Sequence, residues 1–448
     1  MIYQIAGSVL VVAGILLGFV KYLQKRESNN THECLNLLQV DESGMFWGLA
    51  GEAGVSFELA PSKDLRMCAS GEIPTFIAGF SRLLTYLPAR YAISLEAEVT
   101  EGTGLVWNES QNGCHPLLKE IMMEKVKRSG GSGRKVSYFA HLWSADANPL
   151  RLNMFPSLVP SKKKKKNARA ALEENAGSVR ELAGTISASL SSMGVSNRML
   201  NYDEVIQRYW TVLNPQKSER LAPNLVKGYS LRSQLAFSNT QENETWHFLD
   251  GYYHKAITFY TYSDELHTGG VDALLESLPI GSRYIISVLS PDQEEFLDRL
   301  KLQRKRTVAL ASESKTKDYE SQAKEVDLDT IITRARAQGE GIYVVSATII
   351  LRSVNPDQLL EWSKGLLFAI RQIFGGTNGH IEDTLHKQTF LSTLPLNAHL
   401  SPRRNLMLGS TASTLAPLSR GWQGTKRSGL ILYSPTKEPV MMDLFDGN

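Results

Sequence analysis

The stretch "LLTYLPARYAIS" at residues 83–94 returns, with two residues inserted, as "LLESLPIGSRYIIS" at residues 274–287. In each copy, leucines at helical spacing precede a proline that ends the helix, and an Arg-Tyr pair then opens an apolar run typical of a strand. The matching pairs are Leu83/Leu274, Leu84/Leu275, Leu87/Leu278, Pro88/Pro279, Arg90/Arg283, Tyr91/Tyr284, Ile93/Ile286 and Ser94/Ser287. We interpret the match as an internal duplication; a chance alignment of apolar-rich positions is the alternative.

The sequence around both copies predicts the same kinds of elements. Hairpins, strands with alternating apolar residues and amphipathic helices follow one another on either side of a polar, helical middle region. We expect an α+β fold with two related α/β sandwich lobes, built from ferredoxin-like βαβ units and joined by a helical linker. The expected domains are a transmembrane anchor at 1–26, a first α+β lobe at 35–155, a basic helical linker at 160–224 and a second α+β lobe at 225–448.

The N-terminal segment predicts a membrane-spanning helix. The run from Ile2 through Val11 to Val20 contains no ionisable side chain. Its nineteen residues give a helix about 28 Å long, close to the roughly 30 Å of a bilayer's hydrocarbon core. Because Lys21, Lys25 and Arg26 follow the run, a retained anchor with a cytoplasmic chain after it is favoured over a cleaved signal or a buried core helix.

Composition excludes few functions and points to one basic segment. A net charge of +3 does not by itself indicate a nucleic-acid binder, and three cysteines without a C-x-x-C spacing predict neither a disulfide framework nor a zinc site. Five consecutive lysines could form a patch for anionic lipid or nucleic acid, and a solvated loop is the alternative. These are Lys162, Lys163, Lys164, Lys165 and Lys166.

The sequence carries no complete catalytic motif. The glycine-rich "RSGGSGRKVS" at 128–137 has Arg134 before Lys135 and Val136 where a P-loop needs Ser or Thr. The histidines lack zinc-protease spacing, and no G-x-S-x-G elbow is present. The charged helix around 293–306 has the pattern of solvated ion pairs. The sequence therefore predicts no catalytic, cofactor-binding or metal-binding residue in this chain.

The C-terminal stretch at 386–448 resembles the segment before the motor domain in the TraC/TrbE/CagE class of type IV secretion and conjugation ATPases. The phrase Gln, Phe and Leu-Pro-Leu is followed by an arginine pair, a small-residue helix and a Pro-Val strand that ends in acidic residues. The residues that carry the resemblance are Gln388, Phe390, Leu394, Pro395, Leu396, Arg403, Arg404, Pro439, Val440 and Asp443.

The resemblance implies a function in assembly. It suggests the membrane-docking, non-catalytic N-terminal portion of such an ATPase, single-pass at the bacterial inner membrane, which contacts inner-membrane secretion components and a motor subunit and forms homo-oligomers. The family's P-loop would come after Asn448, so ATP and magnesium are expected only for the absent motor domain. The hairpin predicted at 428–445 would be a domain edge. The alternative is an unrelated membrane-anchored cytoplasmic adaptor that binds anionic lipid or nucleic acid through its lysine run.

Overall fold

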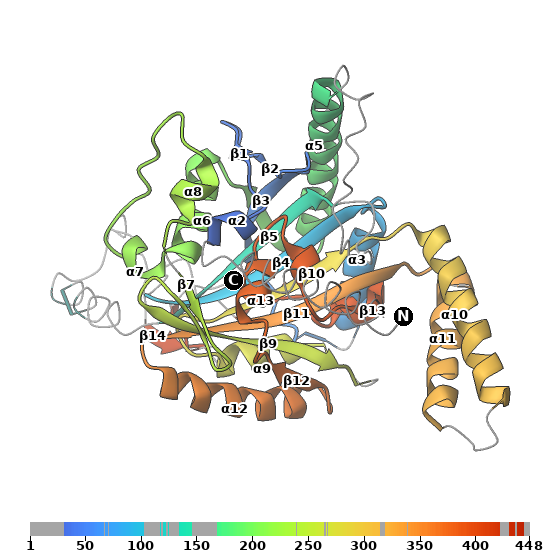
Figure 1. Ribbon diagram of the computed structural model, residues 1–448. Coiled ribbons are helices and arrows are strands. Elements are labelled where there is room, and N and C mark those ends of the chain that lie inside the picture. Colours follow the sequence, from blue (N-terminus) through green and yellow to red (C-terminus); the bar gives the residue numbers. More distant parts are fainter. Residues whose placement is uncertain are drawn as a thin grey trace, which may run out of the picture.

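The computed structural model describes residues 31–102, 134–145, 168–313, 319–421, 430–434 and 437–442, except positions 67, 70, 239, 264, 265, 267 and 338. It also describes a few single positions between 117 and 124. Helices cover both faces of a large antiparallel sheet, and a helical hairpin extends away from it (Figure 1).

The first half of the chain begins with short elements and continues with long strands. Its elements are α2 (Thr31–Cys34), β1 (Gln39–Val40), β2 (Phe46–Trp47), β3 (Ala53–Pro61), α3 (Glu72–Thr85), β4 (Tyr91–Glu101), β5 (Arg134–Ser144), α5 (Ala168–Ser192), β6 (Val195–Met199), α6 (Tyr202–Leu213) and α7 (Pro215–Ser218).

The second half repeats this order and adds the helical hairpin between its two central strands. Its elements are α8 (Leu231–Leu235), β7 (Thr240–Glu242), β8 (His247–Leu249), β9 (Tyr252–Thr261), α9 (Gly270–Ser277), β10 (Arg283–Leu289), α10 (Gln293–Glu313), α11 (Tyr319–Ala337), β11 (Ile342–Ser353), α12 (Pro356–Ile373), β12 (Asn378–Ile381) and α13 (His386–Ser392).

The remaining elements are short. They are the 3₁₀ helix η1 (Ala398–Leu400), β13 (Asn405–Leu408), α14 (Gly409–Ser413), β14 (Leu430–Tyr433) and β15 (Pro439–Met442). The last two pair as an antiparallel hairpin, as predicted for 428–445. The Glu438 carboxylate accepts a hydrogen bond of 2.8 Å from the Val136 amide of β5, so this hairpin is held against the start of that strand.

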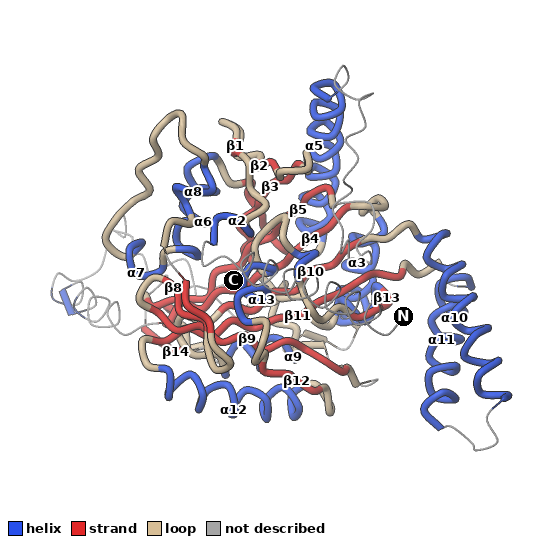
Figure 2. The backbone as a smooth tube through the Cα atoms, in the orientation of Figure 1, coloured by secondary structure: helices blue, strands red, loops and turns tan. Residues whose placement is uncertain are grey.

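Apart from β13, the strand order of the sheet is symmetric about its centre. Its strand order is β1-β2-β3-β5-β4-β10-β11-β9-β8-β7, with β6 paired to β3, β12 paired to β9 and β13 paired to β11. All of these pairs are antiparallel. Figure 2 shows the strands of both halves running side by side through the centre of the molecule.

The centre of this arrangement lies between two serines of the repeated stretch. Ser94 of β4 stands directly opposite Ser287 of β10, and their Oγ atoms are 3.0 Å apart. These are equivalent positions in the two copies. The two halves are therefore related by an approximate two-fold axis that passes between β4 and β10.

The expected division into two lobes is wrong. Because β4 and β10 pair along seven residue pairs, both halves share one thirteen-stranded antiparallel sheet. The stretch expected as a helical linker contributes α5, β6 and α6 to the body, since β6 pairs with β3. The transmembrane anchor expected at 1–26 lies outside the described residues. Among the helices that are described, none is both long enough and apolar enough to cross a membrane.

Each face of the sheet carries its own core. Alternate residues of β4, such as Ile93 and Leu95, face a core that includes residues of α3, α5, α9, α12 and α14. Ala92 on the opposite face belongs to a second core with residues of α6, α8 and α13. Because successive side chains of a strand point to opposite faces of the sheet, β4 contributes residues to both cores.

Candidate functional site

Two glutamates of β4 lie on a buried face of the sheet. Glu96 is 1% exposed and Glu98 is 7% exposed. Both stand on the same face as Ala92, because successive side chains of a strand alternate between faces. Burying a carboxylate is costly unless it is paired and hydrogen-bonded, so these residues need partners from neighbouring elements.

Two arginines from different parts of the chain provide these partners. Arg283 opens β10, and its Nε donates to Glu96 Oε1. Arg208 comes from α6; its Nη2 is 2.6 Å from Glu96 Oε1, and its Nη1 donates to Glu98. The Arg208 guanidinium also lies 4.0 Å from the centre of the Phe139 ring. Two buried carboxylates thus face two guanidinium groups.

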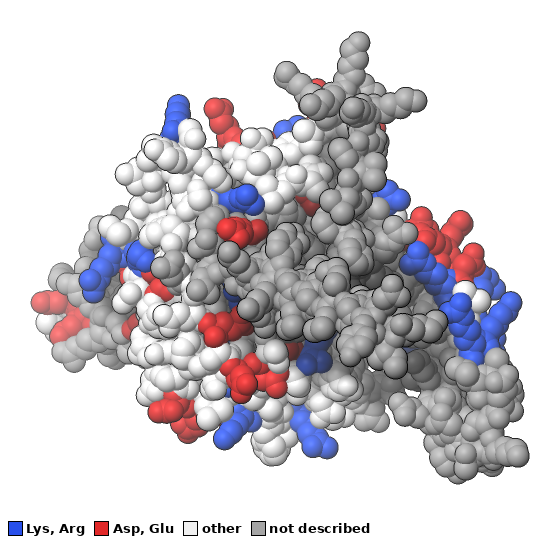
Figure 3. All heavy atoms as spheres, in the orientation of Figure 1, with Lys and Arg blue, Asp and Glu red and all other residues white. Residues whose placement is uncertain are grey.

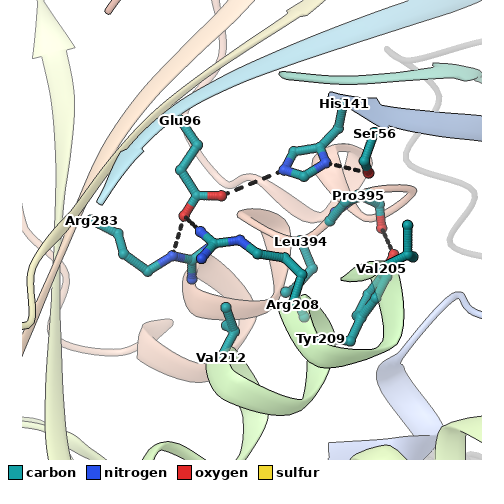
Figure 4. Close-up of a pocket in the computed structure, with 10 residues that line it drawn as sticks. All are labelled: Ser56, Glu96, His141, Val205, Arg208, Tyr209, Val212, Arg283, Leu394 and Pro395. Atoms are coloured by element: carbon teal, nitrogen blue, oxygen red, sulfur yellow. Dashed lines mark hydrogen bonds and ion pairs between the residues drawn. The ribbon is translucent and has the colours of Figure 1, made fainter. Parts of the chain in front are cut away.

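Local sequence places Arg208 over the sheet. Asn201 caps α6 by accepting a hydrogen bond of 3.0 Å from the Glu204 amide, while Glu204 accepts one from the Asn201 amide. This capping box fixes where the helix begins. The apolar side of α6, which includes Val205 and Tyr209, packs into the second core. Arg208 therefore points toward Glu96, as Figure 4 shows.

A histidine and a serine complete the cluster. Ser56 Oγ lies 2.7 Å from His141 Nδ1, and His141 Nε2 lies 3.5 Å from Glu96 Oε2 (Figure 4). Serine, histidine and carboxylate follow in the order of a nucleophilic triad. The cavity that these residues line has a volume of about 10 Å³, which has room for about one water molecule at most. In this conformation the cluster is a packed part of the core rather than an open site.

Burial and the neighbouring charges shift the pKa values of Glu96 and His141. Burial alone would raise the pKa of Glu96, but Arg208 and Arg283 outweigh it and hold that pKa well below its usual range. Burial lowers the pKa of His141, and the two arginines add to this against the opposing effect of Glu96. At neutral pH we therefore expect an ionised Glu96, two charged arginines and a neutral His141.

A turn from the second half covers this site. Tyr209 OH donates to the Pro395 carbonyl at 3.5 Å, and Arg283 Nη1 donates to Thr393 Oγ1 at 3.4 Å. Asn397 Oδ1 accepts a hydrogen bond of 3.1 Å from the Asn36 amide. Leu396 adopts a left-handed backbone with φ of 68°, a conformation that costs energy for a residue other than glycine. The turn thus joins the end of the second half to the start of the first.

The residues singled out from the sequence have structural roles where they are described. Phe390, Leu394 and Leu396 are buried in the second core. Gln388 Nε2 donates to the Leu400 carbonyl at 2.7 Å, and Arg403 Nε donates to Glu382 at 2.8 Å. Arg404 is partly buried, and Pro439 and Val440 are the first two residues of β15. The remaining residues lie outside the described part of the chain: Asp443, the run 2–20 with Ile2, Val11 and Val20, and Lys162 to Lys166.

The sequence did not reveal the cluster itself. Glu96, Arg208 and His141 do not stand in a recognisable motif, and Arg283 belongs only to the repeated stretch. The available signal was the pattern "ISLEAEV", in which polar residues alternate with apolar ones on a strand expected in the interior. The same pattern fits an antiparallel sheet that turns one face to water. Within the described residues, no group of three or more His, Cys, Asp or Glu side chains could hold a metal ion.

A further buried carboxylate gives a test of its own. Asp272 in α9 is 2% exposed, and Ser419 Oγ lies 2.5 Å from each of its carboxylate oxygens. Burial raises the pKa of Asp272 to about 6, against smaller lowering effects of Ser419 and Arg66. Because the folded protein binds this proton more tightly than the unfolded chain does, stability is lost as the pH rises through about 6.

Asp272→Asn should therefore raise the free energy of unfolding by about 1–3 kcal/mol at pH 7.5 and by less at pH 5. Urea unfolding at the two pH values measures this, and an equal effect at both would contradict it.

The cluster joins four segments that are far apart in the sequence. It connects β4 and α6 of the first half with β10 and the turn at 393–397 of the second. Comparison with known protein families and with curated proteins finds no match to this sequence.

Proposed function

We propose that this chain is a protein-docking module, the membrane-docking and non-catalytic N-terminal portion of a type IV secretion ATPase. In this proposal it binds inner-membrane secretion components and supports oligomerisation, and a motor domain or partner subunit supplies ATP hydrolysis. The resemblance of residues 386–448 to the TraC/TrbE/CagE class supports the proposal from the sequence. The observation that carries it is the helical hairpin α10–α11, which we name the arm.

The arm extends from the body into solvent (Figure 1). Its helices have 21 and 19 residues. At 1.5 Å per residue, each is therefore about 30 Å long. Helix pairs of this kind present a large side-chain surface outside the core that folds the rest of the chain. That geometry suits contact with another protein better than it suits a buried small-molecule site.

The base of the arm is built to hold it in place. A small apolar cluster joins both helices to the sheet through Phe296, Leu300, Leu328, Ile342 and Leu408. Arg304 of α10 and Asp329 of α11 form an ion pair at 2.6 Å. The base thus fixes where the arm leaves the body.

Beside this base, the arm exposes both charged and apolar side chains. Arg299 pairs with Glu295, and Lys301 pairs with Asp298, as the sequence pattern indicated. Two large apolar side chains are exposed beside these charges, Leu302 at 50% and Val326 at 63%. In the proposed interface these two side chains would be the apolar contacts and the charged residues around them the polar rim.

Shortening the arm tests the proposal. We expect that replacing residues 306–324 by a short Gly-Ser turn, together with Leu302→Ser and Val326→Ser, leaves the apolar base cluster and the Arg304–Asp329 pair intact. Thermal unfolding should then stay close to that of the full chain. Co-purification with inner-membrane secretion components or with a motor fragment should fall at least about tenfold, which corresponds to the loss of about 1.4 kcal/mol or more of binding free energy.

Two controls accompany the shortened arm. Phe368→Ser changes an exposed apolar side chain on α12, away from the arm, and should leave co-purification unchanged. Unaltered binding by the shortened chain would argue against the arm as the docking element. Magnesium-dependent ATP hydrolysis by the purified full chain would argue against a non-catalytic portion.

A further inference from the structure

The connection between the two halves exposes large apolar side chains. It runs from α7 to the end of α8 on the outside of the molecule, at the left of Figure 1. Its exposed apolar residues are Leu221 at 58%, Val226 at 55%, Tyr229 at 73% and Phe237 at 49%. We name residues 219–237 the connecting loop. So many exposed apolar side chains in one short stretch mark an interaction surface.

The loop is held in this conformation. The Gln234 side chain accepts a hydrogen bond of 2.6 Å from the Val226 amide and donates to the Val226 and Tyr229 carbonyls at 3.1 and 3.2 Å. Leu225 and Leu231 are partly buried against the second core. Two leucines thus anchor the loop inward, so the outward position of Val226 and Tyr229 is fixed by their neighbours.

The end of the loop is also fixed. The Trp210 ring stacks on Phe237 with centroids 5.7 Å apart, and Trp210 Nε1 donates to the Leu221 carbonyl at 3.0 Å. Lys217 lies 4.8 Å from the centre of the Phe237 ring. A surface with these fixed positions loses little conformational entropy on binding.

After Glu219, all charged side chains of the connecting loop are basic. Arg220, Lys227 and Arg232 lie among the apolar residues, and the sequence from 220 to 238 contains no Asp or Glu. Glu219, just before this stretch, accepts a hydrogen bond of 2.6 Å from Tyr252 OH. Figure 3 shows mostly uncharged surface over this part of the molecule, with Lys and Arg atoms and some Asp and Glu atoms at its margin. Aromatic and aliphatic side chains together with basic ones, and without acidic ones, suit a surface that is apolar and negatively charged.

The loop lies beside the point where the described chain begins. α8, within the loop, packs against α2, which starts at Thr31. The segment before it contains the apolar run at 2–20 followed by Lys21, Lys25 and Arg26. In the sequence, a second apolar and basic stretch therefore precedes a helix that packs against the connecting loop.

We propose that the connecting loop binds the surface of an anionic membrane. Tyr229, Val226 and Leu221 would enter the boundary between headgroups and acyl chains, and Arg220, Lys227 and Arg232 would face lipid phosphates. This surface is separate from the arm, so the inference does not rest on protein docking through the arm. A basic residue near an anionic leaflet strengthens binding about fivefold.

Hydrogen exchange of the full chain tests the proposal at the loop itself. The chain is incorporated into vesicles of phosphatidylcholine alone or of phosphatidylcholine with about one third phosphatidylglycerol. We expect amide exchange at 219–232 to slow at least about tenfold in the anionic vesicles and to stay fast in the neutral ones. Because the readout is local, insertion of the run at 2–20 does not produce it.

Matched variants test whether the basic and the apolar side chains of the loop cause the slower amide exchange. Arg220→Ser/Lys227→Ser/Arg232→Ser and Leu221→Ser/Val226→Ser/Tyr229→Ser should each remove the protection, while exchange in β4 and β10 stays slow and reports an intact fold. Leu360→Ser/Phe368→Ser on α12 should leave it unchanged. Equal exchange in both kinds of vesicle would overturn the proposal. Protection by soluble polyglutamate that exceeds protection by anionic vesicles would also overturn it, because it would assign the loop to an acidic protein partner.

Discussion

Replacing Glu96 with glutamine is expected to lower the free energy of unfolding by about 3–5 kcal/mol. Glu96 is 1% exposed and is the partner that Arg208 and Arg283 share. An uncharged amide of similar shape leaves both guanidinium groups in the interior with insufficient negative charge. Urea unfolding followed by circular dichroism at pH 7.5 measures the loss.

A surface pair is the matched control for Glu96. Glu58 pairs with Arg198 at 2.5 Å, but 45% of the Glu58 side chain is exposed. Glu58→Gln should therefore cost only about 0–1 kcal/mol. A loss of similar size in both variants would contradict a special role for the buried cluster.

The Glu96→Gln variant also predicts a pH dependence. The folded-state pKa of Glu96 lies well below its ordinary value of 4.5. Its contribution to stability is therefore fully present above pH 4.5 and is lost as the pH falls toward the folded-state pKa. Glu96→Gln lacks this contribution at every pH. The difference in the free energy of unfolding between the variant and the unaltered protein should therefore become smaller as the pH falls below 4.5.

The buried histidine pair of β8 and β9 is expected to make the protein sensitive to acid in a higher pH window. His247 and His254 stand directly opposite each other, with ring centroids 5.9 Å apart, and Phe390 of α13 packs against both rings. His247 is 0% exposed, and within the described part of the chain neither of its ring nitrogens has a hydrogen-bond partner. A charged imidazole at this position would be poorly solvated.

The neighbouring charges act in the same direction. Burial, with Lys387 and His386 nearby, lowers the pKa of His247 to about 3. Burial lowers the pKa of His254 well below its ordinary value, with His247, Arg352 and Arg283 adding to this. Between about pH 6.5 and pH 3 the unfolded chain binds more protons at these positions than the folded protein does. Stability therefore falls as the pH falls through this window.

His247→Phe isolates this effect. Relative to pH 7.5, the free energy of unfolding of the unaltered protein should fall by about 2 kcal/mol at pH 5 on account of His247 alone, and by about 4 kcal/mol near pH 3. The phenylalanine variant should lack this part of the loss. Phe248→Leu changes the neighbouring side chain of β8 without removing a titratable group, and should keep the original slope. A variant at His247 with an unchanged slope would show that other groups cause the acid sensitivity.

The local elements of the fold could be read from the sequence. α3 ends at Thr85 before Pro88, and β4 begins at Tyr91; α9 ends at Ser277 before Pro279, and β10 begins at Arg283. Proline position and apolar periodicity act over a few residues, so a repeated stretch predicts a repeated helix and strand. The pairing of strands is a contact between distant residues and leaves no comparable local pattern.

The buried cluster depended on those distant contacts. Polar residues at alternate positions of β4 fit a face toward water as well as they fit a face toward buried arginines. Arg208 comes from a stretch that the sequence suggested to be a linker, and Arg283 comes from the other half of the chain. Their position beside Glu96 follows from how β4 and β10 pair and where α6 packs.

Local patterns in the sequence were enough to predict the order of the elements, the repeated helix and strand, and the apolar faces that must be buried. That the two copies complete one sheet, with Ser94 opposite Ser287, rather than two separate lobes, became evident only from the folded structure. A strand edge can pair with any strand of matching length, whereas a buried carboxylate requires a cation in one particular place. The position of Arg208 and Arg283 beside Glu96 therefore depends on the folded chain as a whole.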